Sequence, residues 1–268
     1  MTLGFSVETL VPRARRGGQL RMGLTRLAER EWLQPDFDRA ARAEAFDRWP
    51  ESVAMLPEGE AAGREAAAMI GIGGTLADAA RGVWEDLCVL TPGADGAYRL
   101  VGGAVAFPTD WRLSDKLGLA LTDVHAPIHG YAEQLAAGVD HFMATLAPGT
   151  IFGRANWFVV PDAAPRWMPE GNPAARFAHV DADNAGETLF VRCERQTLRR
   201  LPETGAVLFT IGIHTAPLAA LSDAVVARVG DAVATIGAGE HERRAAPHYA
   251  AALARYAARR QIRPEIAA

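Results

Sequence analysis

Two histidines in one short segment, His125 and His129, are the side chains best suited to bind a metal. Val124 and Ala126 flank His125, and a neutral imidazole in such apolar surroundings binds iron without competition from water. Pro127 stiffens the segment between the two histidines. The alternative is a histidine that caps the following helix or hydrogen-bonds within its loop, because a single histidine is a weak predictor of metal ligation. The residues alone favour this structural role.

A second set of polar residues alternates with apolar ones over residues 154–158. In a strand, Arg154 and Asn156 share one face, whereas Trp157 points to the other. A buried Asn156 on a mainly apolar strand needs hydrogen-bond partners. It therefore either supports a turn or faces a ligand, and both interpretations stay open.

A third set lies in the charged run 192–202. If this run is a strand, Arg192, Glu194 and Gln196 form a row on one face, while Cys193 and Arg195 point to the other. Such a row can line a polar cavity. The alternative is a solvated sheet face crossed by Arg–Glu pairs, which contribute little stability.

The elements that must position these residues follow from hydrophobic spacing and turn signals. Helices are predicted over 36–49, 60–70, 76–87 with Thr75 as N-cap, 130–146, 218–236 and 240–260, the last interrupted at Pro247. Strands are predicted over 88–91, 98–107, 154–160, 188–196 and 206–213, the first two joined by a Pro- and Gly-rich turn. Helices gathered at the ends and strands adjacent in sequence predict an α+β fold with an antiparallel sheet. We expect a single domain over 1–268, with helical additions over about 20–87 and 218–260.

Composition excludes several classes of protein. The 268 residues carry a net charge of −4, with 49% hydrophobic and 22% charged residues, so neither a polybasic nucleic-acid binder nor a disordered chain is expected. No apolar run is continuous enough for a membrane span, and no apolar segment follows Arg13, Arg15 and Arg16 as a secretory signal requires. Two cysteines cannot form a disulfide framework. We therefore expect a cytoplasmic protein.

A family resemblance rests on residues spread from about Met22 to about Leu218. They are Trp32, Trp84-Glu85-Asp86-Leu87, Phe107-Pro108-Thr109-Asp110-Trp111, Lys116-Leu117-Gly118, His125-Ala126-Pro127 with Tyr131, Arg154-Ala155-Asn156-Trp157, and Arg192-Cys193-Glu194-Arg195-Gln196-Thr197-Leu198-Arg199-Arg200-Leu201-Pro202. With these motifs the chain resembles the haem-dependent oxidative N-demethylase alpha-subunit family. The motifs are short, but their combination is specific. It favours ligand-binding roles for His125 and for the charged row.

The resemblance implies a PAS-like fold that binds haem b. By position in the motifs, His125 is the expected axial ligand of the haem iron. His129 is the alternative ligand, since it stands where the family usually has a second proline. Lys116, the only lysine of the chain, is expected to pair with the haem propionates together with Arg154 and Arg199.

The resemblance also implies oxidative N-demethylation of a small secondary amine such as dimethylamine, with release of formaldehyde. Oxygen is the oxidant, and electrons come from a separate flavin or iron–sulfur reductase, because the chain has neither motif. Glu194, Gln196 and Asn156 are the expected acid/base and hydrogen-bonding groups. Glu194 and Trp157 are expected to bind the protonated amine. The segment 213–215 departs from the family pattern, which leaves the substrate open.

Two other functions compete with this enzyme. A haem-binding PAS-like sensor would use the same fold, since fold does not determine function. A sensor usually carries an output domain, for which 268 residues leave no room. A non-catalytic accessory subunit would keep the fold and lose the haem.

Overall fold

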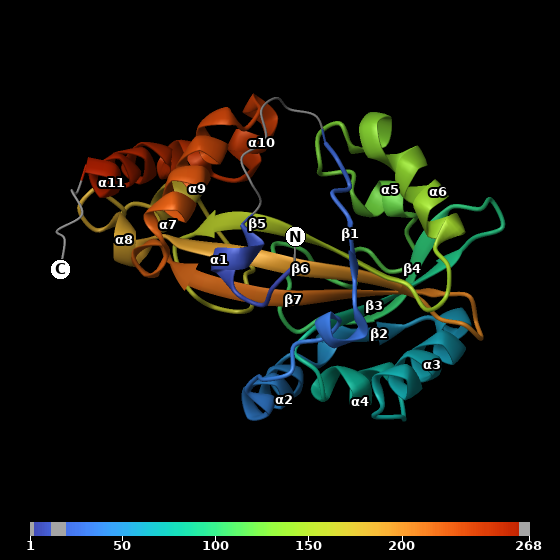
Figure 1. Cartoon of the computed structure of the whole chain (residues 1–268). Helices are drawn as coiled ribbons and strands as arrows, with labels where there is room; N and C mark the ends of the chain where they lie inside the picture. The colour runs from blue at the N-terminus through green and yellow to red at the C-terminus, as the bar shows by residue number, and fades with distance from the viewer. Residues whose placement is uncertain (1–2, 12–19, 263–268) are drawn as a thin grey trace.

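The computed structural model describes residues 3–11 and 20–262, so that Arg13, Arg15 and Arg16 lie outside the described residues. An antiparallel sheet of seven strands forms the centre of this described part (Figure 1). Its strands are β1 (Thr25–Leu27), β2 (Val53–Met55), β3 (Asp86–Pro92), β4 (Tyr98–Ala104), β5 (Ile151–Val160), β6 (Phe190–Arg200) and β7 (Val207–Pro217). They lie side by side in the order β1-β5-β6-β7-β3-β4-β2.

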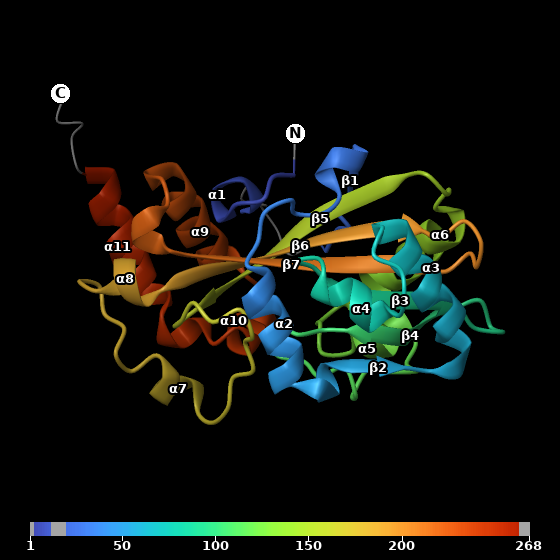
Figure 2. The ribbon, with the colours of Figure 1, turned by 90° about the horizontal axis from the view of Figure 1, so that it is seen from below.

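Three groups of helices surround this sheet. In Figure 1, α2, α3 and α4 lie below it, α5 and α6 lie above it, and α9, α10 and α11 cover one end. Figure 2, seen from below, shows α2, α3 and α4 lying across the strands. The helices are α1 (Val7–Leu10), α2 (Arg39–Arg48), α3 (Glu60–Ile70), α4 (Leu76–Arg81), α5 (Leu121–Val124), α6 (Ala137–Thr145), α7 (Pro173–Arg176), α8 (Ala185–Thr188), α9 (Asp223–Thr235), α10 (Ala238–Arg243) and α11 (Ala250–Ile262).

The predicted α+β class with an antiparallel sheet is confirmed. The five predicted strands are the five neighbours β5-β6-β7-β3-β4, and the predicted hairpin joins β3 to β4. Helix 60–70 is confirmed at both ends, and a π-helical turn at Ala132–Ala136 leads into α6 within the predicted helix 130–146. The chain between α10 and α11 is interrupted at a turn containing Pro247, as expected. The PAS-like assignment stays a prediction.

One predicted helix is wrong in its extent, and two short strands were not predicted. The helix predicted over 76–87 begins correctly, with Thr75 accepting a hydrogen bond from the Asp78 amide, but it ends at Arg81. Residues 82–85 form no regular element, and Asp86 and Leu87 belong to β3, which hydrogen-bonds to β4 on one side and to β7 on the other. The short edge strands β1 and β2 were not predicted, since three residues carry too little alternation to be recognised.

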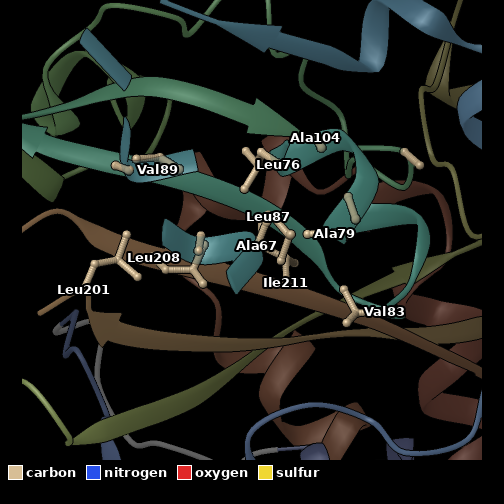
Figure 3. Close-up of a cluster of buried hydrophobic side chains, with 14 of the residues drawn as sticks. Ala67, Leu76, Ala79, Val83, Leu87, Val89, Ala104, Leu201, Leu208 and Ile211 are labelled. Atoms are coloured by element: carbon tan, nitrogen blue, oxygen red, sulfur yellow. The ribbon is translucent and has the colours of Figure 1, made fainter. Parts of the chain in front are cut away.

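A hydrophobic core fixes α3 and α4 against the sheet. Figure 3 shows Ala67, Leu76 and Ala79 of these helices packed against strand residues such as Leu87 and Leu208. These side chains are buried almost completely, so each contributes about 1–3 kcal/mol of hydrophobic stabilisation in proportion to its size. A second core lies under α9 and α11, and a third lies under α5 and α6. Within the described residues, no helix is long and apolar enough to cross a bilayer.

Candidate functional site

A cavity of about 380 Å³ lies on the face of the sheet that α5 and α6 partly cover, a volume within the usual range for small-molecule sites. Its walls combine apolar strand residues with polar groups from loops and from α10. They are Cys88, Leu90, Leu100, Thr109, Asp110, Trp111, Arg112, Asp115, Lys116, Leu121, Val124, His125, Pro127, Ile128, Asn156, Phe158, Glu194, Gln196, Phe209, Ile211 and Arg243.

Three of the predicted residues form one hydrogen-bonded group in this cavity. Asn156 of β5 pairs directly with Glu194 of β6 in the sheet register, and Gln196 follows on the same face. The Gln196 side-chain amide donates to Glu194 Oε2 at 2.9 Å, and that of Asn156 donates at 3.5 Å. Within the described residues no donor reaches the other carboxylate oxygen, Oε1. The group therefore presents a hydrogen-bonded carboxylate on a wall of the cavity.

His125 lies at the end of α5, and its ring is oriented by two contacts. Nδ1 lies 2.7 Å from the Leu121 carbonyl oxygen, which can only accept, so Nδ1 carries the proton and Nε2 keeps its lone pair. The ring stacks on Tyr131, with centroids 4.3 Å apart and planes at 14°. Burial lowers the pKa of His125, and the charges of Arg154 and Lys116 lower it further, partly opposed by the hydrogen bond to Leu121. The imidazole is thus held neutral, as a metal ligand must be.

The loop that carries much of the cavity wall is tied to the sheet by buried arginines. Arg192 of β6 donates to the Thr109 hydroxyl at 2.9 Å and to the Phe107 carbonyl at 2.9 Å. Asp86 of β3 accepts from the Ala106 amide at 2.8 Å and from Arg42 of α2 at 2.7 Å. Lys116 donates to the Val124 carbonyl at 2.7 Å, which closes the loop next to His125. These contacts position the loop on the strand face.

Sequence reasoning missed four charged residues of the cavity: Asp110, Arg112, Asp115 and Arg243. Asp110 has a left-handed backbone (φ +59°), a conformation that few residues other than glycine adopt and that concentrates at functional sites. Asp110 stands in the motif 107–111, one of those on which the family resemblance rests, and this motif is the sequence signal that could have identified it. Arg243 reaches the cavity from α10 and forms an ion pair with Glu240 at 2.8 Å. No local pattern connects it to the cavity residues of β5 and β6, which lie more than forty residues earlier.

Several predicted residues lie away from the cavity. Trp157 and Arg199 are both on the opposite face of the sheet: Trp157 packs against the core under α9 and α11, and Arg199 pairs with Glu29 at 2.5 Å and stacks on Trp32. Their positions follow from strand alternation, which directs odd-numbered residues of β5 and β6 away from Asn156 and Glu194. His129 is exposed and does not line the cavity.

Arg154 and His214 also lie outside the set of residues that line the cavity. Arg154 is on the same strand face as Asn156, and its charge acts on His125, although it is not among the residues that line the cavity. In the segment 213–215, His214 pairs with Cys193 and faces away from the cavity. Ile213 and Thr215 pair with Glu194 and Arg192, but none of residues 213–215 is among those that line the cavity, so the departure from the family pattern does not change the cavity wall.

Comparison with known protein families matches the chain to one family model. The model is described as "Haem-dependent oxidative N-demethylase, alpha subunit-like", and it matches residues 74–254. The match covers more than half of the chain and includes every residue that lines the cavity. It begins after α3 and extends into α11, further toward the C-terminus than the resemblance noted from the motifs.

Proposed function

Because the chain belongs to the haem-dependent oxidative N-demethylase, alpha subunit-like family, we propose that it binds haem b through His125 and demethylates a small secondary amine. The family name indicates haem dependence and an oxidoreductase lineage. The observation that carries the proposal is the orientation of His125: Nδ1 donates to Leu121, so the lone pair of Nε2 is available to a metal at the cavity wall.

The residues present fit a haem group. Leu90, Leu100, Phe158 and Phe209 supply the apolar walls that a porphyrin requires. An iron brought in by a porphyrin needs only one protein ligand, and His125 supplies a neutral imidazole. A bound haem would supply the oxygen chemistry that amino-acid side chains lack.

Cations in the cavity wall fit the propionate groups of a haem. Arg112, Lys116 and Arg243 line the cavity, and Arg154 lies close enough to His125 for its charge to act there. We assign the propionates to this group. Arg199 is left out because it lies on the opposite face of the sheet and is paired with Glu29.

The Glu194 group fits a protonated secondary amine. An alkylammonium ion needs a carboxylate, and Glu194 Oε1 is the oxygen that Asn156 and Gln196 leave uncommitted. In this role the two amides hold the carboxylate in place while Oε1 accepts an N–H of the substrate. The same carboxylate is the group placed to accept a proton from the substrate nitrogen. Trp157 has no part in this binding, because it faces away from the cavity.

The reaction needs a source of electrons outside the described residues. Removal of a methyl group as formaldehyde oxidises the methyl carbon, and reduction of the second oxygen atom of O2 to water consumes two electrons and two protons. We therefore propose a separate flavin or iron–sulfur reductase as partner.

Formaldehyde release tests this function. The haem-loaded protein, supplied with dimethylamine, oxygen and reducing equivalents, should release formaldehyde. Glu194→Gln should raise KM for the amine about tenfold or more, because it removes a charged hydrogen bond. Trp157→Phe is the matched control and should leave KM unchanged. A haem-loaded protein that releases no formaldehyde would contradict the enzyme and favour a sensor, and an unchanged KM in Glu194→Gln would contradict the role of Glu194.

A further inference from the structure

Two buried polar groups lie beside the same glycine on the face of the sheet opposite the cavity. Gly212 of β7 pairs with Arg195 of β6. The Arg195 side chain points away from Glu194, to the same face on which a side chain at position 212 would lie. A methyl group on Gly212 would lie 3.5 Å from Glu85 Oε1 and 3.5 Å from His214 Nε2. The glycine thus leaves a space of about methyl size between a carboxyl group and an imidazole.

Both groups contain an atom that needs a hydrogen-bond partner. Within the described residues, neither Glu85 Oε2 nor His214 Nε2 has one, although both atoms are buried. The other oxygen of Glu85 accepts from the Gln34 amide at 2.9 Å. A buried polar atom left without a partner costs about 1–3 kcal/mol, so the carboxyl group and the imidazole, both of which approach Gly212, each need one further partner.

We propose that the space over Gly212 is a binding site for one water molecule, held between the Glu85 carboxyl and the His214 imidazole. Water both donates and accepts, so it satisfies the two groups whichever of them carries a proton. A metal ion or an ammonium ion does not suit the site, because the charges of Arg195 and Arg42 already act on Glu85. An anion is excluded by the carboxyl group itself.

Neighbouring segments close the site against bulk solvent. Arg195 donates to the carbonyl oxygens of Gly4 at 3.2 Å and Trp32 at 2.8 Å, which fastens two distant segments over this part of the sheet. The Phe5 ring lies over the Arg195 guanidinium and 6.5 Å from the His214 ring. A water held here is therefore part of the folded structure rather than of the surface.

The shifted pKa values of Glu85 and His214 are consistent with an uncharged ligand such as water. Burial raises the pKa of Glu85 to about 7 and lowers the pKa of His214 to about 4, the nearby Arg195 charge adding to the second effect. Near neutral pH the imidazole is uncharged and the carboxyl group is close to half protonated. Arg195 and Arg42 are the charged groups that act on the pair from β6 and α2.

Gly212→Ala tests the proposal through the sign of its effect on stability. Glycine weakens a strand, and the new methyl group meets nothing closer than 3.5 Å, so packing alone predicts a neutral or stabilising change. A displaced water instead leaves Glu85 and His214 unsatisfied and should raise the unfolding equilibrium constant about tenfold. Gly230→Ala in α9 is the matched control, because its methyl group would meet only the Ala257 side chain, also at 3.5 Å, and should stabilise the helix.

A high-resolution crystal structure of each protein completes the test. The wild-type protein should show one water within about 3.2 Å of the Glu85 carboxyl and of His214 Nε2, and Gly212→Ala should show none. A direct hydrogen bond between Glu85 and His214, an empty space over Gly212, or a Gly212→Ala protein at least as stable as wild type would overturn the proposal.

Discussion

The imidazole of His125 lies nearly parallel to the ring of Tyr131, with centroids 4.3 Å apart and planes at 14°. Together with the hydrogen bond from Nδ1 to Leu121, this contact restricts rotation of the imidazole about both of its side-chain bonds. The orientation of Nε2 is therefore set before any ligand arrives. A preorganised donor binds more tightly because less conformational freedom is lost on binding.

Replacement of Tyr131 should weaken haem binding only when the aromatic ring is lost. Tyr131→Phe keeps the stack and should leave haem affinity unchanged, whereas Tyr131→Leu should raise the haem Kd about threefold to tenfold, the range expected for an aromatic pair. Haem titration followed by absorption measures both. Equal affinities for the two variants would show that the stack does not position His125.

Removal of the Asp86 carboxylate should destabilise the fold severely. Asp86 accepts from Arg42 and from the amides of Ala106 and Phe107, where the cavity loop begins. Asp86→Ala leaves the buried Arg42 charge without its partner and should lower the free energy of unfolding by about 3–5 kcal/mol. Denaturant unfolding gives this value. Asp47→Ala is the control, because its ion pair with Arg81 is exposed and should contribute less than about 1 kcal/mol.

The buried carboxyl group of Glu85 should make stability depend on pH around neutrality. Its pKa is raised to about 7 in the folded protein from 4.5, so its contribution is complete below pH 4.5 and is lost as the pH rises through 7. Between pH 6 and pH 8, wild type should lose about 1 kcal/mol of stability relative to Glu85→Gln. The difference between the two proteins is the quantity to measure, because His214, whose pKa is lowered, contributes in the opposite direction in both. A difference that is constant over this range would contradict the raised pKa.

Strand alternation is the part of the site that is predictable from sequence. The period of two along residues 154–158 and 192–196 groups Asn156, Glu194 and Gln196 on one face, and the antiparallel register brings them into contact. The same period directs Trp157 and Arg199 to the other face. Both residues were assigned to the site from the motifs, and a motif by itself carries no information about which face of a strand a residue occupies.

Contacts between distant segments account for what the sequence did not reveal. Arg243 reaches the cavity only because α10 folds back toward the loop around Asp110, a long-range arrangement with no local signal. Asp86 and Leu87, the last two residues of the helix predicted over 76–87, belong to β3 instead, because β3 gains hydrogen bonds from two neighbouring strands, which local propensity does not include. The contacts of His125 were also not predictable from the sequence, because the Leu121 carbonyl and Tyr131 become its partners only when the loop folds.

The absorption spectrum of the protein produced with a haem precursor tests the central claim most directly. Wild type should show a Soret band, His125→Ala should lose it or shift it, and His129→Ala should keep it, because His129 is exposed and lies outside the cavity wall. Circular dichroism of each variant confirms that the fold is retained. A Soret band that is unchanged in His125→Ala, or that disappears in His129→Ala, would contradict the assignment of the axial ligand. A wild-type protein without any Soret band would contradict haem binding itself.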